Sequence, residues 1–156
     1  MLAGYPELPG FAFEGTINEL TLMDHSTIPP QEGTAYPVLV STVDGDGNAT
    51  AGLRHPVLQV PHATLLGWNL RAEGYAKGDL YSSIGGQVPL ARSKAERLAK
   101  EDHRASIQER YASNADYVAK LRQVCDTMIT DRLLLSEDGD RIVAAAEAGE
   151  NVLTAA

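Results

Sequence analysis

The stretch from Tyr36 to Arg71 constrains the fold of this chain most, because it carries a strong β-hairpin signal. An apolar run, Tyr36 to Val43, is followed by the turn sequence Asp-Gly-Asp-Gly-Asn and a short return run. Asp, Asn and Gly tolerate the positive φ angles that tight hairpin turns need. An apolar run between two prolines and the tail Gly-Trp-Asn-Leu-Arg complete the stretch. We therefore predict that it folds back on itself.

The first 35 residues have no regular hydrophobic pattern, because prolines at positions 6, 9, 29 and 30 interrupt it. Proline and glycine at this density are typical of a segment that lies over another surface and forms no core of its own. We predict an extended strap for residues 1–35, with room for a short strand in FAFEG and another in INELTLMD. Residues 72–91, which hold four glycines, are predicted as a loop.

Helix signals fill the remainder of the chain. Ser93 and Ser106 are each followed three residues later by Glu, the spacing of a capping box, so each predicts the start of a short helix. The longest predicted helix begins near residue 113 or 114 and runs to about residue 134. Its apolar residues recur at three- and four-residue spacing and form one stripe: Ala115, Val118, Leu121, Cys125, Met128 and Ile129. A last helix is predicted at residues 137–148, ending at Gly149.

Together these elements predict an α+β fold in a single unit, residues 1–156, of ordinary domain size. Apolar residues make up 44 % and charged residues 22 %, which is a globular balance. The predicted order is the strap (1–35), the hairpin and its tail (36–71), the loop (72–91) and a region of three to four helices (92–150).

Charge and hydropathy exclude several classes of partner. Thirteen basic against 21 acidic residues give a net charge of −8, which disfavours binding to nucleic acid or to an anionic membrane. Apolar runs are too short for a transmembrane helix, and the N-terminal residues lack the basic and apolar regions of a signal peptide. We expect a soluble chain, and the sequence leaves its compartment open. The only cysteine, Cys125, lies on the apolar helix stripe, so we expect a buried, unreactive thiol.

Neither a metal nor a cofactor is indicated by the motifs. Residues 44–48 copy the first, third and fifth ligand positions of an EF-hand loop, but Ala49 and His55 stand where that loop needs Gly and Glu. The histidines at positions 25, 55, 62 and 103 show no HxxH or HExxH spacing, and a single cysteine allows no CxxC. We interpret the acidic stretch as a plain turn and the histidines as structural or surface residues.

Nucleophilic catalysis is not indicated either. A serine hydrolase needs a serine activated by a base, and in an α/β-hydrolase that serine lies in a G-x-S-x-G turn between a strand and a helix. No serine of this chain has glycines at that spacing, and Ser93, Ser106 and Ser113 are better explained as helix caps. No catalytic residue is therefore predicted.

The motifs YPVLVSTVDGDGN, AGLRHP and GWNLR resemble the C-terminal signature of a family of large, mostly uncharacterised bacterial proteins, the alpha/beta hydrolase domain family. The segments VPLARSKAERLAKEDHRASIQERY and DYVAKLR are similar to the C-terminal helices of the same family, so the resemblance covers nearly the whole chain. The resemblance implies that the nucleophile turn and the catalytic histidine of the parent protein lie upstream of the matched region. It also implies that the parent hydrolyses an ester or amide.

Two interpretations follow. In the first, the chain is a C-terminal segment of an α/β-hydrolase-like protein, not a complete α/β-hydrolase fold, and is inactive alone; its partner is the remainder of the hydrolase body, or a second copy. In the second, it is a non-enzymatic α+β module that binds a partner through the hairpin face. The sequence does not decide between them, and enzyme status stays uncertain.

Four polar or aromatic residues of the signature are candidate binding residues: Arg54, Trp68, Asn69 and Arg71. They would form a lid or rim over a hydrolase active site, with an arginine holding an acidic group of the substrate. Alternatively, Trp68 packs, Asn69 caps or turns, and the two arginines pair with nearby carboxylates.

Overall fold

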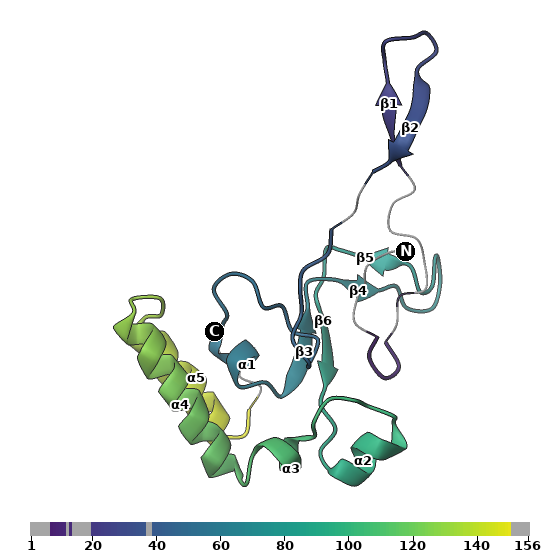
Figure 1. The fold of residues 1–156 in the computed structure, drawn as a ribbon. Helices are drawn as coiled ribbons and strands as arrows, with labels where there is room; N and C mark the ends of the chain where they lie inside the picture. The colour runs from purple at the N-terminus through teal and green to yellow at the C-terminus, as the bar shows by residue number, and fades with distance from the viewer. Residues whose placement is uncertain (1–6, 12, 14–19, 37–38, 151–156) are drawn as a thin grey trace.

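The computed structural model describes residues 7–11, 13, 20–36 and 39–150. Within this part of the chain, three separate two-stranded antiparallel sheets precede a helical region (Figure 1). The predicted α+β class is confirmed. Most of FAFEG lies outside the described residues, so the strand suggested there is not tested.

The first sheet is a hairpin of β1 (Thr21–Asp24) and β2 (Gln31–Ala35), which stands away from the other elements (Figure 1). We call residues 20–36 the arm. β1 lies in the segment INELTLMD, as the sequence suggested, but β2 was not predicted. Two of the prolines that break the pattern, Pro29 and Pro30, lie in the connection between the two strands, where they leave both strands intact.

The hairpin turn at residues 44–48 forms, with far less strand than predicted. The N–H of Asp44 donates to the carbonyl of Asn48 at 2.8 Å, and the N–H of Thr50 donates to Thr42 at 3.0 Å. Beyond the bridge between Val43 and Ala49, the described residues 39–43 form no strand. The side chain of Leu39 is 92 % exposed. The apolar run therefore lacks the buried face that would hold it as a strand.

The other two sheets position the signature tail, which is the Gly-Trp-Asn-Leu-Arg motif at residues 67–71. β3 (Ala63–Leu66) pairs with β6 (Gly86–Pro89), and β4 (Asn69–Leu70) pairs with β5 (Leu80–Tyr81). β5 and β6 lie in the segment predicted as a loop, so that prediction was wrong there. The two glycines at positions 85 and 86 are the reason: a Cβ on them would lie 2.7 Å from the carbonyl oxygen of Leu66 and 2.9 Å from that of Trp68. They permit a close backbone approach rather than marking a loop.

Five helices are described: α1 (Pro56–Gln59), α2 (Lys94–Ala99), α3 (Ile107–Arg110), α4 (Asn114–Thr130) and α5 (Ser136–Glu147). Ser93 and Ser113 accept the predicted first-turn N–H bonds, and Ser106 forms a complete capping box with Glu109. α4 ends four residues earlier than predicted. The φ of Arg132 is +59°, and the N–H of Leu133 bonds back to Met128, which closes the helix end.

The main core lies where α4 packs against α5 and against α1 (Figure 1). Leu121, Cys125 and Val143 are fully buried there. The predicted position of the single thiol in the core is thus confirmed. A second, smaller cluster contains Leu8, Leu66 and Trp68 next to the signature tail.

Shortening Leu121 to alanine should lower the free energy of unfolding by about 3 kcal/mol, because the side chain is fully buried between helices and its removal leaves a cavity. Urea denaturation monitored by circular dichroism measures this loss. Leu133→Ala, at a side chain that is 49 % exposed, is the matched control and should cost less than about 1 kcal/mol. Equal losses in both variants would contradict this description of the core.

Candidate functional site

A buried arginine, Arg104, lies at the centre of a network of side-chain hydrogen bonds. Arg104 is fully buried, and its five N–H groups are all bonded. Its Nε and Nη2 donate to the two carboxylate oxygens of Asp102 at 2.9 and 2.7 Å. Its Nη1 donates to Thr64 Oγ1 at 2.7 Å, and the remaining bonds reach the carbonyls of Val88 and Pro89. The guanidinium therefore ties the segment between α2 and α3 to both β3 and β6.

This network continues into the hairpin turn. The hydroxyl of Thr64 donates onward to the carbonyl of Asp46. The carboxylate of Asp46 in turn pairs with Arg110 of α3, whose Nη1 lies 2.8 Å away. The hairpin turn at residues 44–48, which we call the acidic turn, is thus held to β3 and α3 by one continuous set of hydrogen bonds.

Asn48 fixes the turn from the other side. Its side chain is fully buried; Nδ2 donates to the carbonyl of Ala63 at 3.2 Å, and Oδ1 accepts the N–H of Leu65 at 2.8 Å. The side-chain amide therefore bonds to β3 as a neighbouring strand would.

The carboxylate of Asp44 has partners as well. Its Oδ1 accepts the N–H groups of Asp46 and Asn48, both at 3.0 Å, and its Oδ2 accepts from Arg54 at 2.7 Å. Among the described residues no group of three or more side chains could hold a metal ion. The two acidic side chains of the turn serve different arginines, which explains why an EF-hand-like sequence forms a structural turn.

Burial and bonding act in opposite directions on Asp102. Burial alone would raise the pKa of its carboxyl group, but the hydrogen bonds and charge of Arg104 outweigh this effect and lower that pKa. At neutral pH Asp102 and Arg104 form an ion pair, and the side chains of both residues are almost completely buried.

The four candidate residues of the signature separate into two places. Arg54 lies beside the acidic turn, where it pairs with Asp44 and also donates to the carbonyl of Leu58 at 2.7 Å. Trp68 packs in the small core with its ring 5.2 Å from that of Phe11. Asn69 donates to the carbonyl of Gly85.

Arg71 contacts an aromatic ring rather than a carboxylate. Its guanidinium carbon lies 4.9 Å from the ring centre of Tyr81, and in the described part of the chain it forms no ion pair. A groove of about 330 Å³ lies here, lined by Asn69, Arg71, Tyr75, Tyr81 and Ile84 among others. Arg71 and Asn69 thus share one groove, and Arg54 is not among its lining residues.

Two of the histidines have structural contacts. Nδ1 of His55 accepts the N–H of Val57 and caps α1. The ring of His62 stacks on Tyr117 at 3.8 Å. Burial lowers the pKa of both imidazoles. In the part of the chain that the structure describes, no hydrogen bond joins a serine hydroxyl to a histidine.

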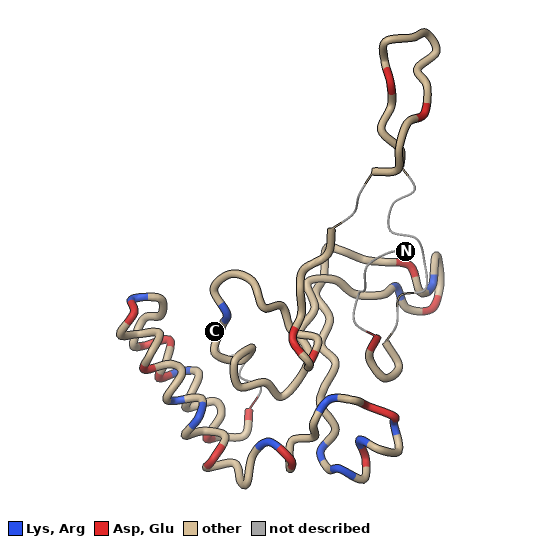
Figure 2. Tube along the Cα trace, viewed as in Figure 1, with Lys and Arg blue, Asp and Glu red and all other residues tan. Residues whose placement is uncertain are grey.

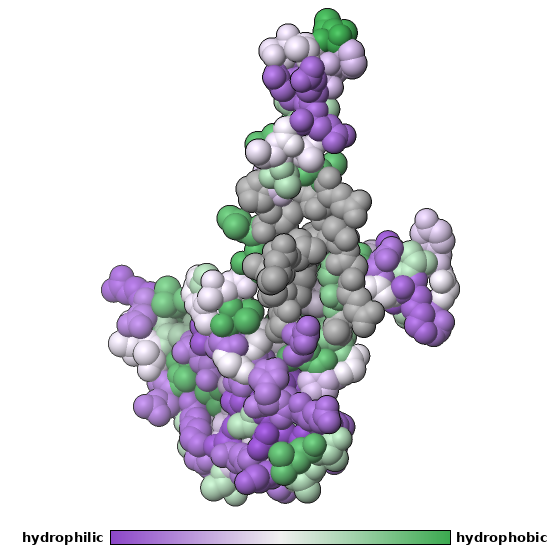
Figure 3. Space-filling view, turned by 45° about the vertical axis from the view of Figure 1, so that its right-hand side comes forward, coloured by the Kyte–Doolittle hydropathy of each residue, from purple (hydrophilic) through white to green (hydrophobic). Residues whose placement is uncertain are grey.

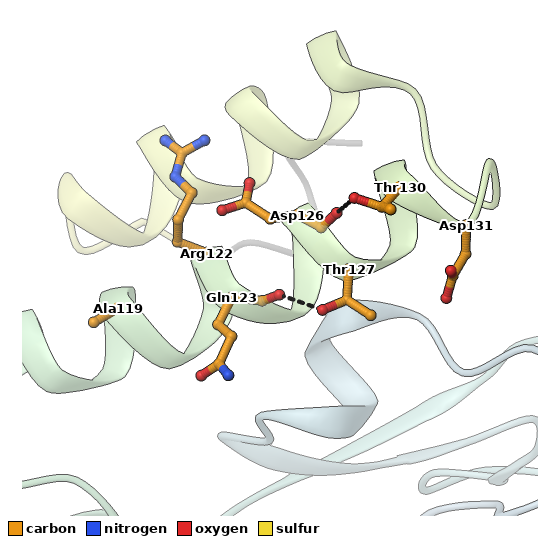
Figure 4. Close-up of a pocket in the computed structure, with 7 residues that line it drawn as sticks. All are labelled: Ala119, Arg122, Gln123, Asp126, Thr127, Thr130 and Asp131. Carbon is orange, nitrogen blue, oxygen red and sulfur yellow. Dashed lines mark hydrogen bonds between the residues drawn. The ribbon is translucent and has the colours of Figure 1, made fainter.

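A groove of about 490 Å³ lies along α4. Figure 4 labels the residues that line it. Its two threonines donate to carbonyls of their own helix, Thr127 to Gln123 and Thr130 to Asp126. Arg122, at its edge, pairs with Asp140 of α5. Most of the side chains that line this groove are polar, and the hydrogen bonds of Arg122 and of the two threonines stay within α4 and α5.

The family assignment rests on a comparison with protein-family models. The model for the alpha/beta hydrolase domain matches residues 6–144. The chain belongs to this family. The match includes the acidic turn, the signature tail and the Arg104 network, so the resemblance inferred from the sequence is confirmed.

Searches of curated proteins and of solved structures found no match to the chain. Among the described residues, no helix is long and apolar enough to cross a membrane.

Sequence reasoning missed the centre of this hydrolase-family structure. Asp102, Arg104 and Thr64 were not singled out, although the first two lie in the segment EDHRAS that resembles the family helices. A carboxylate two residues before an arginine, between two short capped helices, was the available signal. Charged residues near a helix end usually lie on a solvated surface, so Asp102 and Arg104 did not stand out as a buried pair.

Replacing Arg104 by methionine should lower the free energy of unfolding by about 3 to 5 kcal/mol, because Asp102 would remain buried without a partner. Urea denaturation measures the loss. Arg92→Met, at an exposed arginine, should change stability by less than about 0.5 kcal/mol. The double variant R104M/D102L should be more stable than R104M alone; equal stability would contradict a paired carboxylate.

Stability should also fall in acid because of the Ser106 capping box. Hydrogen bonds from the backbone and side chain of Ser106, and then from Arg97, lower the pKa of Glu109 to about 2, from 4.5. A carboxyl group whose pKa is lower in the folded state stabilises the fold above pH 4.5, and this contribution is lost as the pH falls toward 2. Thermal unfolding temperatures across this range should decline less steeply for Glu109→Gln than for the wild type. Parallel profiles would refute the assignment.

Proposed function

We propose that this chain is the non-catalytic C-terminal segment of an α/β-hydrolase-like protein, and that ester or amide hydrolysis takes place on a complementary hydrolase body. The observation that carries the proposal is the use of the serines. In a family of hydrolases, Ser93, Ser106 and Ser113 all act at helix starts, and none bonds to a histidine. The chain would contribute surface and shape to the parent protein, and the body would contribute the nucleophile.

Exposed apolar side chains support a contact with such a body. Tyr36, Leu39 and Leu53 are exposed near the two ends of the acidic turn segment. Beside them lies a groove of about 320 Å³ whose lining includes Leu39, Val43 and Trp68. An apolar surface of this kind favours contact with another protein surface.

Arg71 is our candidate for contact with an acidic group of the substrate. Arg54 is already paired with Asp44, whereas the guanidinium of Arg71 is held by a ring face and keeps its donors available to a carboxylate. Asn69 lines the same groove, and Trp68 would support it from the small core. In this proposal the signature tail forms a rim of the active site, and a bound acid would lie across the groove.

A specific observation also supports the alternative, a non-enzymatic binding module that folds as one unit over residues 1–156. The network around Arg104 is complete within the chain, because each N–H of the guanidinium already has an acceptor. Such a chain would need no second polypeptide to satisfy its buried charge, and the hairpin face would bind a partner.

The two functions can be separated by complementation. The catalytic part of a family member that carries G-x-S-x-G is prepared without the region equivalent to residues 36–144 and mixed with this chain. Restored hydrolysis of a p-nitrophenyl ester, lost again with Arg104→Met, is the expected result. A well-folded chain that binds no hydrolase body would support the module instead.

The chain alone should show no turnover of p-nitrophenyl acetate above the buffer rate, because in the described residues no serine hydroxyl donates to a histidine, and the carboxylate that accepts from Ser106 belongs to a helix capping box. A colorimetric assay at neutral pH measures this, with a protein lacking esterase activity as the blank. Turnover that persists after replacement of every serine would overturn the proposal.

A further inference from the structure

The arm is a two-stranded sheet that no other described helix or strand covers. Its strands contact each other, and of their nine residues all but Thr21 are exposed. Ile28, in the connection between the strands, is 100 % exposed. Figure 3 shows the arm standing clear of the lower part of the molecule. A lone two-stranded sheet is marginally stable in water, and further strands are needed for independent stability.

The two edges of the arm differ. Thr21 pairs with Ala35, and Met23 pairs with Glu32. Between these two pairs β1 advances by two residues and β2 by three, so the extra residue of the bulge lies on β2. A bulge is one of the devices that block addition to an edge. β1 is regular and contains no proline or lysine. β1 is therefore the edge open to another strand.

Hydrogen bonds within the arm show which groups of β1 point outward. Tyr36 donates its N–H to the carbonyl of Leu20, so Leu20 faces β2. A Cβ on Gly33 would lie 2.8 Å from the carbonyl oxygen of Leu22, so Leu22 faces β2 as well. Because backbone groups alternate along a strand, Thr21 and Met23 direct their N–H and C=O groups away from β2.

We propose that β1 pairs antiparallel with β1 of a second copy of this chain, about a two-fold axis through Leu22. Thr21 of each copy then exchanges both backbone hydrogen bonds with Met23 of the other. The product is a four-stranded sheet in the order β2, β1, β1 and β2. This interface does not involve the hydrolase body, so it stands or falls independently of the proposed function.

The sequence of β1 fits its own copy in this register. Leu22, which is 51 % exposed in the single chain, faces Leu22 of the second copy across the axis. Leu20 lies opposite Asp24, so no like charges meet. Figure 2 shows that the arm carries acidic residues and no lysine or arginine. Two bodies of net charge −8 repel each other, and the length of the arms keeps them apart.

Analytical ultracentrifugation of the full chain over a range of concentrations tests the interface. The wild type should be dimeric at high concentration, and Leu22→Lys should be monomeric, because two ammonium groups would meet at the axis. Leu53→Lys is the matched control, since Leu53 is an exposed leucine outside the arm, and it should dimerise as the wild type does. A monomeric wild type, or a dimer that Leu22→Lys leaves unchanged, overturns the proposal.

Two further variants test the backbone pairing itself. Met23→Pro removes an outward N–H without touching the bonds between β1 and β2, and it should abolish the dimer. Facing residues at a non-hydrogen-bonded position are near enough for a disulfide, so Leu22→Cys should form a covalent dimer on mild oxidation. Cys125 is fully buried and leaves this assay clear. Leu53→Cys should cross-link much more slowly; equal rates, or a dimer retained by Met23→Pro, would show that the contact is not this one.

Discussion

The structure depends on burying one charged guanidinium completely. An arginine removed from water costs several kcal/mol unless each donor is bonded and its charge is balanced. Arg104 meets both conditions with a single bidentate carboxylate and three oxygens from β3 and β6. Because these acceptors come from distant parts of the chain, the arginine can be satisfied only when the segment before α3 and the two strands are correctly placed. Any other placement of these segments would leave a buried charge without partners, so the cost of burying Arg104 favours this one arrangement of the segment and the two strands.

The acidic turn is held in place by the same hydrogen bonds. Thr64 accepts from the arginine and donates to the carbonyl of Asp46, while Asn48 bonds to the backbone of β3 on either side of Thr64. A hairpin normally holds its turn through the strands that flank it. Here the flanking strands are almost absent, and side-chain bonds to β3 replace them.

Local signals allowed the helical half to be predicted, and long-range contacts decided the remainder. Capping serines and a three- and four-residue apolar repeat act within one or two turns, so Ser93, Ser106 and the α4 stripe could be identified from the sequence. The glycines at positions 85 and 86 have the same local signature in a loop and in a tight strand pair, and only the partner strand distinguishes the two. Arg104 is harder still, because its acceptors lie up to 40 residues away. The signature motifs were recognised together, yet their arginines, Arg54 and Arg71, act in different places.

The same network gives an apolar surface its rigidity. Leu39 and Leu53 lie outside the acidic turn on its two sides, and neither is held by a core of its own. The turn between them is fixed at Asp46 by α3 and at Asn48 by β3. A surface whose supports are ordered before binding loses less conformational entropy when a partner covers it. In the proposed function, the buried charge of Arg104 would contribute no chemistry to hydrolysis and would serve recognition by holding the groove beside Trp68 in one shape.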